Sequence, residues 1–278
     1  MMYYVLHNPK SNKGLSRLKV AALIKKIKKT HEVKKVNVIR ILNQEKEFLK
    51  ELTIDDALVI CGGDGTINRF VNGIIGAEII CKVFIYQCGS GNDMSRDFKK
   101  GMFEVTQVFK NLPKVKINGE KDATFINGIG MGFDAQVCLK KEEYSKKKSK
   151  KGYAAIALES LKDFNPYPLD IEIDGENVHF NNVLLFVVNH GKYFGGGMKI
   201  APKATRFDSK LDLVIVHDLT KFKFLMLFLT IFPGAHILFK KYVYYKQASS
   251  FKINHIDVDF AQLDGEITTD IKTLEIKA

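Results

Sequence analysis

The sequence has no tryptophan, only 6 prolines and only 4 cysteines among its 278 residues. The cysteines, at positions 61, 81, 88 and 138, show no Cys-x-x-Cys spacing, and three of them lie in or beside apolar runs. Reduced core thiols of a cytoplasmic protein are therefore expected. No apolar run reaches about 18 residues, so no membrane-spanning helix is predicted. The N-terminus begins with a strand-like run, which is not typical of a signal peptide.

Acidic residues are too few to balance the basic ones. The 31 Asp and Glu residues stand against 43 Lys and Arg residues, which gives a net charge of +12. This excess indicates an anionic partner: nucleic acid, a phosphate-rich ligand or an anionic membrane surface. The alternative is that the lysines serve solubility alone. A hydrophobic content of 46% at this length is typical of a globular protein with one large or two medium domains.

The stretch from Ala57 to Asn72 is the one around which the chain is organised. Ala57 to Cys61 is apolar on both faces, which predicts a short buried parallel strand. The Gly62-Gly63-Asp64-Gly65 run should break the strand, with glycines supplying positive φ angles. A helix is expected from Thr66, its N-cap, because apolar residues follow at helical spacing. A strand, a glycine loop and a helix start present backbone N–H groups to an anion, whereas a plain tight turn is the alternative.

The first half of the chain alternates predicted strands and helices. Strands are expected at Met2 to Leu6, Val36 to Ile41, Ala57 to Cys61 and Val83 to Tyr86. Amphipathic spacing of Val20, Leu23, Ile24 and Ile27 predicts one helix, and Glu45 to Leu52 a short second one. This alternation favours a parallel sheet covered by helices, in which ligands bind at the carboxyl ends of the strands.

After Pro113 the pattern changes to short alternating segments separated by turns, which predicts an antiparallel, sandwich-like second half. The expected strands are Leu169 to Ile173, Val183 to Val188, Leu211 to Val216, Val258 to Leu263 and Thr273 to Ile276, with one helix at Tyr153 to Phe164. The sequence therefore predicts an α/β domain over residues 1–120 and a β-rich domain over residues 121–278. The last strand could pack on either domain.

Six motifs in order resemble the catalytic family of diacylglycerol kinases, which includes sphingosine kinases. They are Asn8-Pro9-Lys10-Ser11; Gly62-Gly63-Asp64-Gly65-Thr66 with Asn68; Gly89-Ser90-Gly91-Asn92-Asp93 with Arg96; Asn127 with Gly130, Gly132, Phe133 and Asp134; Gly195-Gly196-Gly197 with Ala201-Pro202; and Leu263-Asp264-Gly265-Glu266. The glycine loop alone also resembles that of NAD kinases and phosphofructokinases. The resemblance implies ATP-dependent phosphorylation of a lipid hydroxyl between an α/β nucleotide domain and a β-rich substrate domain.

The resemblance implies a nucleotide site in the first domain. The nucleotide-binding residues it indicates are Asn8, Ser11, Gly62, Gly63, Asp64, Gly65, Thr66, Asn68, Ser90, Asn92 and Asp93. Asp64 is also the expected ligand and catalytic carboxylate for Mg²⁺, since hard cations take carboxylate oxygens. Its alternative role is to fix the geometry of the loop.

Asp-Gly-Glu occurs twice, at Asp174-Gly175-Glu176 and at Asp264-Gly265-Glu266. The first copy lies between two alternating runs and predicts a hairpin turn. Local sequence does not separate the two copies, but the resemblance implies that Glu266 is the general base and Asp264 its metal or supporting partner. The resemblance also implies a structural cation at Asp208, with the carbonyls of Thr205 and Lys210. The Gly195 to Gly197 run is expected to permit close backbone packing.

Two stretches indicate contact with a membrane. The lysine-rich run Lys140 to Lys151 could lie against anionic headgroups, or form a solvated disordered loop. Phe222 to Phe239 is apolar with lysines at its ends, which is typical of an interfacial element or of a buried helix pair broken at Pro233-Gly234.

The sequence is accordingly interpreted as a lipid kinase of phospholipid metabolism that uses ATP and Mg²⁺. It would act on a lipid substrate as a cytoplasmic enzyme peripheral to the inner face of an anionic membrane. No nucleic acid is expected as a partner, and a homodimer is compatible with the sequence. The alternatives are an NAD kinase-like enzyme with a soluble substrate and a non-catalytic regulator that binds lipid or nucleotide.

Overall fold

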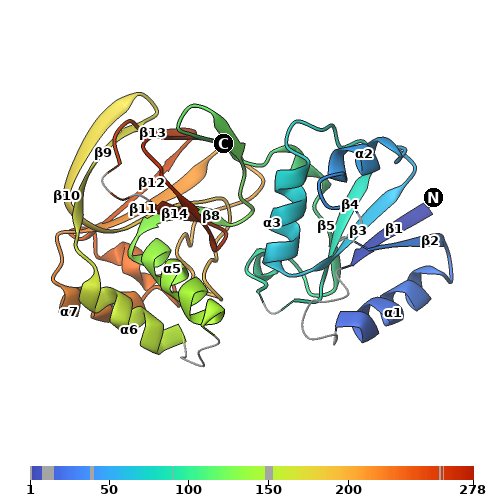
Figure 1. Cartoon of the computed structure of the whole chain (residues 1–278), viewed down its shortest axis with the longest axis horizontal. Coiled ribbons are helices and arrows are strands. Elements are labelled where there is room, and N and C mark those ends of the chain that lie inside the picture. The colour runs from blue at the N-terminus through green and yellow to red at the C-terminus, as the bar shows by residue number, and fades with distance from the viewer. Residues whose placement is uncertain are drawn as a thin grey trace. The chain divides into compact units, whose positions relative to one another are not determined.

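A five-stranded sheet with the order β2-β1-β3-β4-β5 forms the centre of the first of two units, Met1–Leu112 and Pro113–Ala278 (Figure 1). The computed structural model describes residues 2–7, 16–37, 41–89, 91–147, 153–256, 258 and 260–278. The strands are β1 (Met2–His7), β2 (Glu32–Asn37), β3 (Ala57–Gly62), β4 (Lys82–Gln87) and β5 (Met102–Glu104). The first four are parallel, and β5 is antiparallel to β4. All six residues of β3 are buried, as its continuous apolar run predicts.

Helices connect these strands. They are α1 (Ser16–Ile27), α2 (Glu45–Lys50), α3 (Asp64–Gly73), the 3₁₀ helix η3 (Met94–Asp97) and α4 (Thr106–Lys110). The amphipathic spacing in α1 is confirmed, because Val20, Leu23 and Ile27 are buried in one cluster with Val5 and Val59. Since β1, β3 and β4 run parallel, their carboxyl ends meet at one edge of the sheet.

Two boundaries in this unit differ from those predicted. The second strand is described as Glu32–Asn37 and begins four residues before the predicted Val36 to Ile41, because it pairs with β1 from Met2 opposite Glu32 to His7 opposite Asn37. Residues 38–40 of the predicted range lie outside the described residues. As an edge strand it is only half-buried, so its polar residues hid it from the apolar pattern. The helix after the glycine loop begins at Asp64 with Gly63 as its N-cap, so Thr66 lies in its first turn.

The second unit is built on a curled antiparallel sheet that contains 11 strands within the described residues. Its path is β15-β14-β8-β10-β9-β13-β16-β6-β7, and β11 pairs with β10 and with β12. The strands are β6 (Lys114–Ile117), β7 (Lys121–Ala123), β8 (Gly128–Gly132), β9 (Tyr167–Ile173), β10 (Glu176–Asn189), β11 (Leu211–His217), β12 (Val243–Ala248), β13 (Ser250–Ile253), β14 (Phe260–Leu263), β15 (Glu266–Thr269) and β16 (Leu274–Lys277). An α/β unit followed by a β-rich unit confirms the predicted fold class. The last strand, β16, pairs with β13 and β6 of its own unit.

Three helices gather at one end of the second unit (Figure 1). They are α5 (Phe133–Lys146), α6 (Tyr153–Asp163) and α7 (Lys221–Leu229), and the 3₁₀ helix η4 (Ala235–Leu238) follows α7. The Phe133 ring of α5 lies 5.0 Å from the ring of Phe224 in α7. Lys221 Nζ of α7 donates to the carbonyl of Lys162 in α6 at 2.6 Å.

The lysine-rich run is helical where the structure describes it. Lys140 to Lys146 belong to α5, so the alternative of a disordered loop does not hold for these residues, and residues 148–152 lie outside the described residues. Lys140 forms ion pairs with Glu159 and Asp163 of α6, and Lys146 pairs with Glu142 at 2.7 Å. These contacts neutralise two of the charges that were expected to face a membrane. No helix within the described residues is long and apolar enough to cross a membrane.

Candidate functional site

Two glycines at the carboxyl ends of β3 and β4 pack backbone against backbone. A Cβ on Gly89 would lie 2.6 Å from the backbone nitrogen of Gly63, and a Cβ on Gly63 would lie 2.6 Å from the carbonyl oxygen of Gly91. Hydrogen bonds close the contact, from Cys88 N–H to Gly62 O and from Asp64 N–H to Gly91 O, each at 3.0 Å. Gly63 has a φ of −107°, so the prediction that these glycines supply positive φ is wrong. Gly63 and Gly89 are required because a side chain on either residue would collide with the backbone of the neighbouring loop.

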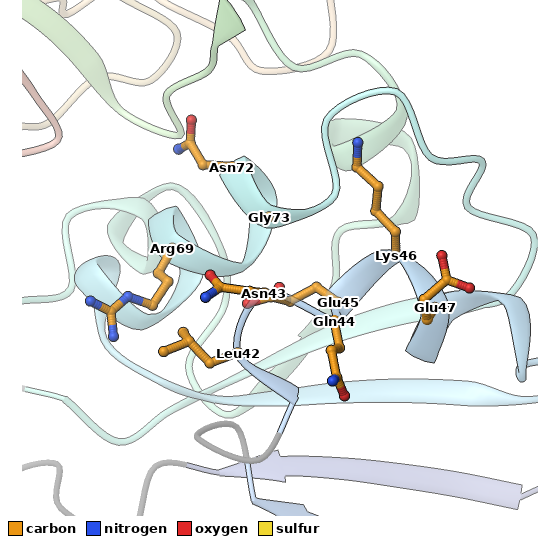
Figure 2. Close-up of a pocket in the computed structure, with 9 residues that line it drawn as sticks. All are labelled: Leu42, Asn43, Gln44, Glu45, Lys46, Glu47, Arg69, Asn72 and Gly73. Carbon is orange, nitrogen blue, oxygen red and sulfur yellow. The ribbon is translucent and has the colours of Figure 1, made fainter.

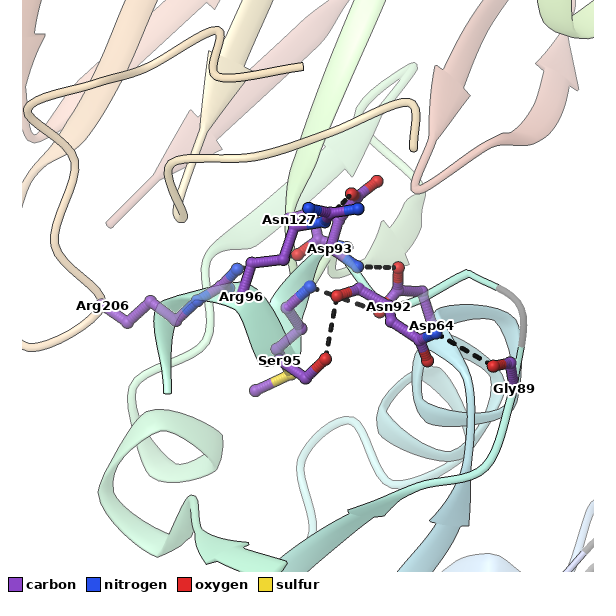
Figure 3. Close-up of polar contacts among 9 residues, drawn as sticks. Asp64, Gly89, Asn92, Asp93, Ser95, Arg96, Asn127 and Arg206 are labelled. Atoms are coloured by element: carbon purple, nitrogen blue, oxygen red, sulfur yellow. Dashed lines mark hydrogen bonds and ion pairs between the residues drawn. The ribbon is translucent and has the colours of Figure 1, made fainter. Parts of the chain in front are cut away.

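Asp64, the first residue of α3, holds the loop that follows β4 (Figure 3). Its Oδ2 accepts the N–H of Asp93 at 2.7 Å, and its Oδ1 accepts the N–H of Met94 at 3.4 Å. The residue is only 9% exposed. Asp64 therefore has the loop-fixing role that the sequence left open as an alternative to metal binding.

The loop after β4 is also held by its own side chains (Figure 3). Asn92 Nδ2 donates to the carbonyl of Gly89 at 2.9 Å, and Ser95 Oγ donates to the carbonyl of Asn92 at 2.9 Å. Asp93 is buried and forms an ion pair with Arg96, with 3.5 Å between Oδ1 and Nε. The structure thus brings Asp64, Asn92 and Asp93 together at one edge of the sheet. Three other predicted nucleotide-binding residues, Asn8, Ser11 and Ser90, lie outside the described residues.

The first turn of α3 contains one open position. Gly65 is exposed, and a Cβ added there would meet no atom within 4 Å. Thr66 instead packs over Gly62, because a Cβ on Gly62 would lie 2.5 Å from the Cβ of Thr66. Asn68 is buried one turn later, and its carbonyl accepts Asn72 Nδ2 at 3.0 Å. The accessible backbone at this helix start is therefore centred on Gly65.

A pocket of about 590 Å³ lies at the other end of α3 (Figure 2). Its lining is Leu42, Asn43, Gln44, Glu45, Lys46, Glu47, Arg69, Asn72 and Gly73. None of the predicted site residues lines it. Its acidic and basic side chains are mixed, so the pocket does not indicate an anion site.

In the second unit, the two Asp-Gly-Glu copies adopt the same turn. Asp174 and Gly175 have φ angles of 49° and 87°, and Asp264 and Gly265 have φ angles of 51° and 89°. Two residues with positive φ between antiparallel strands form the hairpin turn that Asp-Gly favours. The hairpin predicted at Asp174 is therefore confirmed, and Asp264 lies in a second hairpin between β14 and β15.

The aspartates of the two turns bind different segments. Asp174 Oδ1 accepts the backbone N–H groups of Ser249 and Ser250 at 3.0 and 2.8 Å. Asp264 accepts three consecutive N–H groups, from Ile126, Asn127 and Gly128, at 2.7, 2.8 and 3.1 Å. The turn that carries Glu266 is thus fixed to the chain that enters β8, and the Glu266 side chain is left exposed.

A buried arginine that was not among the predicted site residues lies beside this turn. Arg206 is 3% exposed and donates to the carbonyl of Ile126 and, through NH2, to Asn127 Oδ1 at 2.8 Å (Figure 3). Burial and the nearby Arg206 charge lower the pKa of His190 to about 3, so this imidazole stays neutral. The backbone N–H of His190 donates to the carbonyl of Asn127 at 2.8 Å. Only the match at Asn127 pointed to this cluster from the sequence.

A second missed group is the pair Asp134 and Gln262. Gln262 Nε2 donates to Asp134 Oδ2 at 3.0 Å, and Gln262 Oε1 accepts the N–H of Gly265 at 2.7 Å. A Cβ on Gly130 would collide with Asp134 Oδ2, which explains why glycine stands there. Burial raises the pKa of Asp134 to about 7, and the hydrogen bond from Gln262 offsets this only in part. A proton-binding group is therefore connected to the turn of Glu266 through one side chain.

The remaining predictions concern Asp208 and the glycine triplet. Asp208 is exposed and accepts the N–H of Lys210 at 3.2 Å. Among the described residues, no cluster of three or more His, Cys, Asp or Glu side chains could hold a metal ion. Gly195, Gly196 and Gly197 have φ angles of 59°, 91° and 106° and form a turn between Phe194 and Met198. All three supply positive φ, and a Cβ on Gly196 would meet no atom within 4 Å, so the expected close packing is absent at that position.

The close backbone contact between Gly63 and Gly89, and the open space at Gly65, predict opposite results for two alanine substitutions. Gly89→Ala should lower the free energy of unfolding by roughly 1–3 kcal/mol, because the new methyl group meets backbone that cannot rotate away. Gly65→Ala should leave it unchanged or raise it by up to about 1 kcal/mol, because alanine favours a helix and the space is open. Urea unfolding followed by circular dichroism measures both. Equal losses would contradict the tight crossing.

Asp134 predicts a specific dependence of stability on pH. Its folded pKa of about 7 lies above the unfolded value of 3.8, so the folded state retains the proton longer. The free energy of unfolding should therefore fall as pH rises from about 4 to about 7, on the order of 3 kcal/mol for this group. Asp134→Asn, which keeps an acceptor for Gln262, should remove that dependence.

Urea titrations at about pH 5 and about pH 8 test this effect, with Asp122→Asn as the control at an exposed aspartate. The difference in the free energy of unfolding between Asp134→Asn and the wild type should grow with pH. The corresponding difference between Asp122→Asn and the wild type should stay the same at both pH values. A constant difference would show that Asp134 does not retain its proton.

Comparisons with known proteins cover nearly the whole chain. A family model described as "Diacylglycerol kinase catalytic domain" matches residues 2–119, and one described as "YegS C-terminal NAD kinase beta sandwich-like domain" matches residues 127–275. The chain is 26% identical over 275 residues to a diacylglycerol kinase of Bacillus subtilis (strain 168), covering 94% of this chain and 88% of that protein. It is 29% identical over 287 residues to a diacylglycerol kinase of Staphylococcus aureus (strain JH9), covering 98% and 89%.

Other matches agree. The match to a diacylglycerol kinase of Mycobacterium tuberculosis (strain CDC 1551 / Oshkosh) is 26% identical and spans 66% of this chain and 62% of that protein. A crystal structure of a diacylglycerol kinase from Bacillus anthracis str. Sterne has a TM-score of 0.68 at 21% identity, covering 99% of this chain and 93% of that chain. That structure shows that the fold is shared. Because the two family models together match residues 2–119 and 127–275, the chain belongs to the diacylglycerol kinase family.

Proposed function

We propose that this protein is a lipid kinase that transfers the γ-phosphoryl group of ATP, with Mg²⁺, to a hydroxyl of diacylglycerol or a related lipid. Membership of the family supports a kinase with a lipid acceptor. The observation that carries the donor chemistry is the start of α3, where Gly65 leaves open backbone beside a carboxylate and a braced loop. On this proposal residues 1–120 bind the nucleotide and residues 121–278 bind the lipid.

The start of α3 is suited to polyphosphate. The N-terminus of a helix carries a partial positive charge, and exposed backbone N–H groups there bind phosphate oxygens. Gly65 would allow an oxygen to approach the backbone where any other residue would place a side chain. Asp64 and Asn92 fix the surrounding loop before a ligand arrives, which lowers the entropy lost on binding. The loop around Gly65 would therefore receive the phosphates.

The carboxylates in this unit fit a magnesium ion that is shared with the substrate. Mg²⁺ is usually held by one or two protein carboxylates together with phosphate oxygens and water. Asp64 and Asp93 are both buried at the loop, and a carboxylate that accepts N–H bonds still has lone pairs for a cation. When bound, Mg²⁺ would neutralise charge on the phosphates. Asp208, exposed and bonded only within its own loop in the contacts described above, is the weaker candidate for a structural cation.

Glu266 is the group that we assign to the acceptor hydroxyl. It follows a turn that Asp264 fixes through three backbone N–H groups and Gln262 through a fourth. A general base must be accessible to substrate and held in position, and an exposed side chain on a fixed turn satisfies both conditions. Asp264 would then act as a positioning residue for Glu266.

A lipid panel tests the proposal directly. The protein is incubated with ATP, Mg²⁺ and each of diacylglycerol, a polyprenol, a sphingoid base and phosphatidylglycerol, and products are identified by mass spectrometry. We expect phosphate on one lipid class and a requirement for Mg²⁺. The description of the second unit as NAD kinase-like makes NAD the informative soluble competitor. Label that moves from ATP into NAD and not into organic-extractable product would replace this proposal.

The open position at Gly65 gives a test of the donor site. Gly65→Ala should raise the KM for ATP roughly tenfold or more while the protein stays folded, because the methyl group occupies the approach of a phosphate. The KM for the lipid should change little. Steady-state kinetics with either substrate varied measure this, and an unchanged KM for ATP would place the phosphates elsewhere.

The two Asp-Gly-Glu turns give a matched test of the base. Glu266→Gln should lower kcat by roughly 10²–10⁴-fold, since glutamine keeps the size of the side chain but cannot accept a proton at neutral pH. Glu176→Gln changes the same tripeptide in the same turn type and should leave kinetics unchanged. Its only cost is an exposed ion pair with Lys246, which contributes little.

Both variants are assayed on the same lipid, and circular dichroism confirms that each is folded. Loss of general-base catalysis should appear in kcat more than in the KM for the lipid. Equal losses in the two variants would remove Glu266 from the mechanism. A loss at Glu176 alone would assign the reaction to the other hairpin.

A further inference from the structure

Large apolar side chains gather on the surface of the segment from Phe222 to Phe239. We define the α7–η4 patch as six side chains and their exposed fractions: Phe222 (72%), Met226 (47%), Leu229 (60%), Phe232 (50%), Leu238 (75%) and Phe239 (46%). The other large apolar side chains that are exposed among the described residues are scattered singly through the chain. Single exposed apolar residues are ordinary, but a contiguous patch marks an interaction surface.

The patch is a second apolar face on a helix whose first face is already buried. Phe222, Met226 and Leu229 follow i, i+4, i+7 spacing and so line one side of α7. Phe224 and Leu227 line the other side and are buried in the core, where the Phe224 ring packs against Phe133 of α5. Core packing therefore explains only one face of this helix. The exposed face needs a different apolar partner.

Basic residues border the patch, and its own segment contains no acidic residue. Lys223, Lys240 and Lys241 are exposed, and Lys221 lies beside them in the sequence. Between Asp218 and Asp257 the sequence contains no Asp or Glu. Lys223 and Lys241 both lie over the ring of Tyr242, at 6.0 and 5.3 Å from its centre, so they share one edge of the segment. An apolar surface bordered by cations is complementary to anionic lipid.

The patch is held rigidly by the core beneath it. His236 of η4 is fully buried, and its Nε2 donates to the carbonyl of Ile200 at 2.8 Å. Burial lowers the pKa of this histidine, so it stays neutral and adds no charge to the surface. Gly234 adopts a φ of 82°, and a Cβ added there would lie 3.1 Å from the Cβ of Pro202 and 3.2 Å from the Cδ of Lys199. The apolar side chains are thus presented on an ordered scaffold.

We propose that the α7–η4 patch docks the protein onto an anionic lipid bilayer. The six apolar side chains enter the boundary between headgroups and acyl chains, and Lys223, Lys240 and Lys241 contact the headgroups. Elements of this kind lie in the membrane surface without crossing it. Lys140 and Lys146 of α5 are engaged in ion pairs, so the α7–η4 patch is the better membrane contact of the two. The inference concerns attachment and does not depend on the phosphoryl transfer proposed above.

The absence of tryptophan makes a site-specific experiment simple, because one introduced indole is the only one in the chain. Leu238→Trp places it in the patch, and Ile54→Trp places it at a control position with a nearly equal exposed fraction of 74%. Each protein is mixed with vesicles of phosphatidylcholine containing about one quarter phosphatidylglycerol. We expect a blue shift of emission only for Leu238→Trp, and none with phosphatidylcholine alone.

Vesicle flotation then measures the energetics. Replacing Lys223, Lys240 and Lys241 with Gln should weaken vesicle binding about fivefold for each lysine. Added salt should weaken binding of the wild type more than binding of this variant, because salt screens the charges of the lysines. Phe222→Ser with Leu238→Ser should weaken it roughly tenfold or more. Lys146→Gln with Lys147→Gln is the matched control on α5 and should have little effect. Circular dichroism verifies folding of every variant.

Three results would overturn the proposal. The Leu238→Trp emission could fail to shift with anionic vesicles, or the patch variants could bind vesicles as the wild type does. Alternatively, light scattering could show a dimer that Phe222→Ser with Leu238→Ser converts to monomer, which would make a second copy the occupant. These measurements need neither ATP nor turnover. A protein that binds vesicles through the patch but phosphorylates no lipid would refute the proposed function and leave this inference standing.

Discussion

Aspartates that accept backbone N–H groups from distant segments are the interaction on which both candidate sites depend. Asp64 holds the Asp93 loop, Asp174 holds Ser249 and Ser250, and Asp264 holds Ile126 to Gly128. Hydrogen bonds to a charged group contribute more than neutral ones, about 1.5–3 kcal/mol each. Each aspartate connects segments that are far apart in the sequence. Loops that would otherwise be mobile are thereby fixed as parts of the scaffold.

In the proposed function, the same carboxylates both hold loops in place and serve the phosphoryl transfer. A carboxylate has about four lone-pair sites, and backbone N–H groups occupy only some of them. In that proposal Asp64 would brace the loop through Asp93 N–H and also contact Mg²⁺, so the two roles that the sequence analysis set out as alternatives would belong to one residue. Asp264 differs, because it accepts three N–H groups, and in the proposed function it positions Glu266. Asp134 contacts the same turn indirectly, because it accepts a hydrogen bond from Gln262, which in turn accepts the N–H of Gly265.

The sequence predicted what depends on local pattern and missed what depends on distant partners. The buried strand β3, helix α1 and the hairpin at Asp174 follow from periodicity and turn chemistry, and the structure confirms them. Strand β2 was misplaced because an edge strand shows little apolar alternation, and α5 was missed because its last turns are lysine-rich. Gln262 and Asp134 are 128 residues apart, so no local signal joins them. Glu176 and Glu266 are locally identical, and only the resemblance distinguished them.

A short path of contacts joins helix α7, which carries part of the α7–η4 patch, to the turn of Glu266 within the second unit. Phe133 packs against Phe224 and Phe228 of α7, and its neighbour Asp134 bonds Gln262, which holds Gly265. Spatial continuity alone is not evidence of allosteric coupling, which requires an element with two states. A rigid connection does something simpler: it fixes the orientation of the turn relative to the docked helix. A lipid whose chains remain in the bilayer presents its hydroxyl at a defined height. If α7 docks on the bilayer and Glu266 is the base, this connection would set the distance between Glu266 and the lipid hydroxyl before any lipid binds.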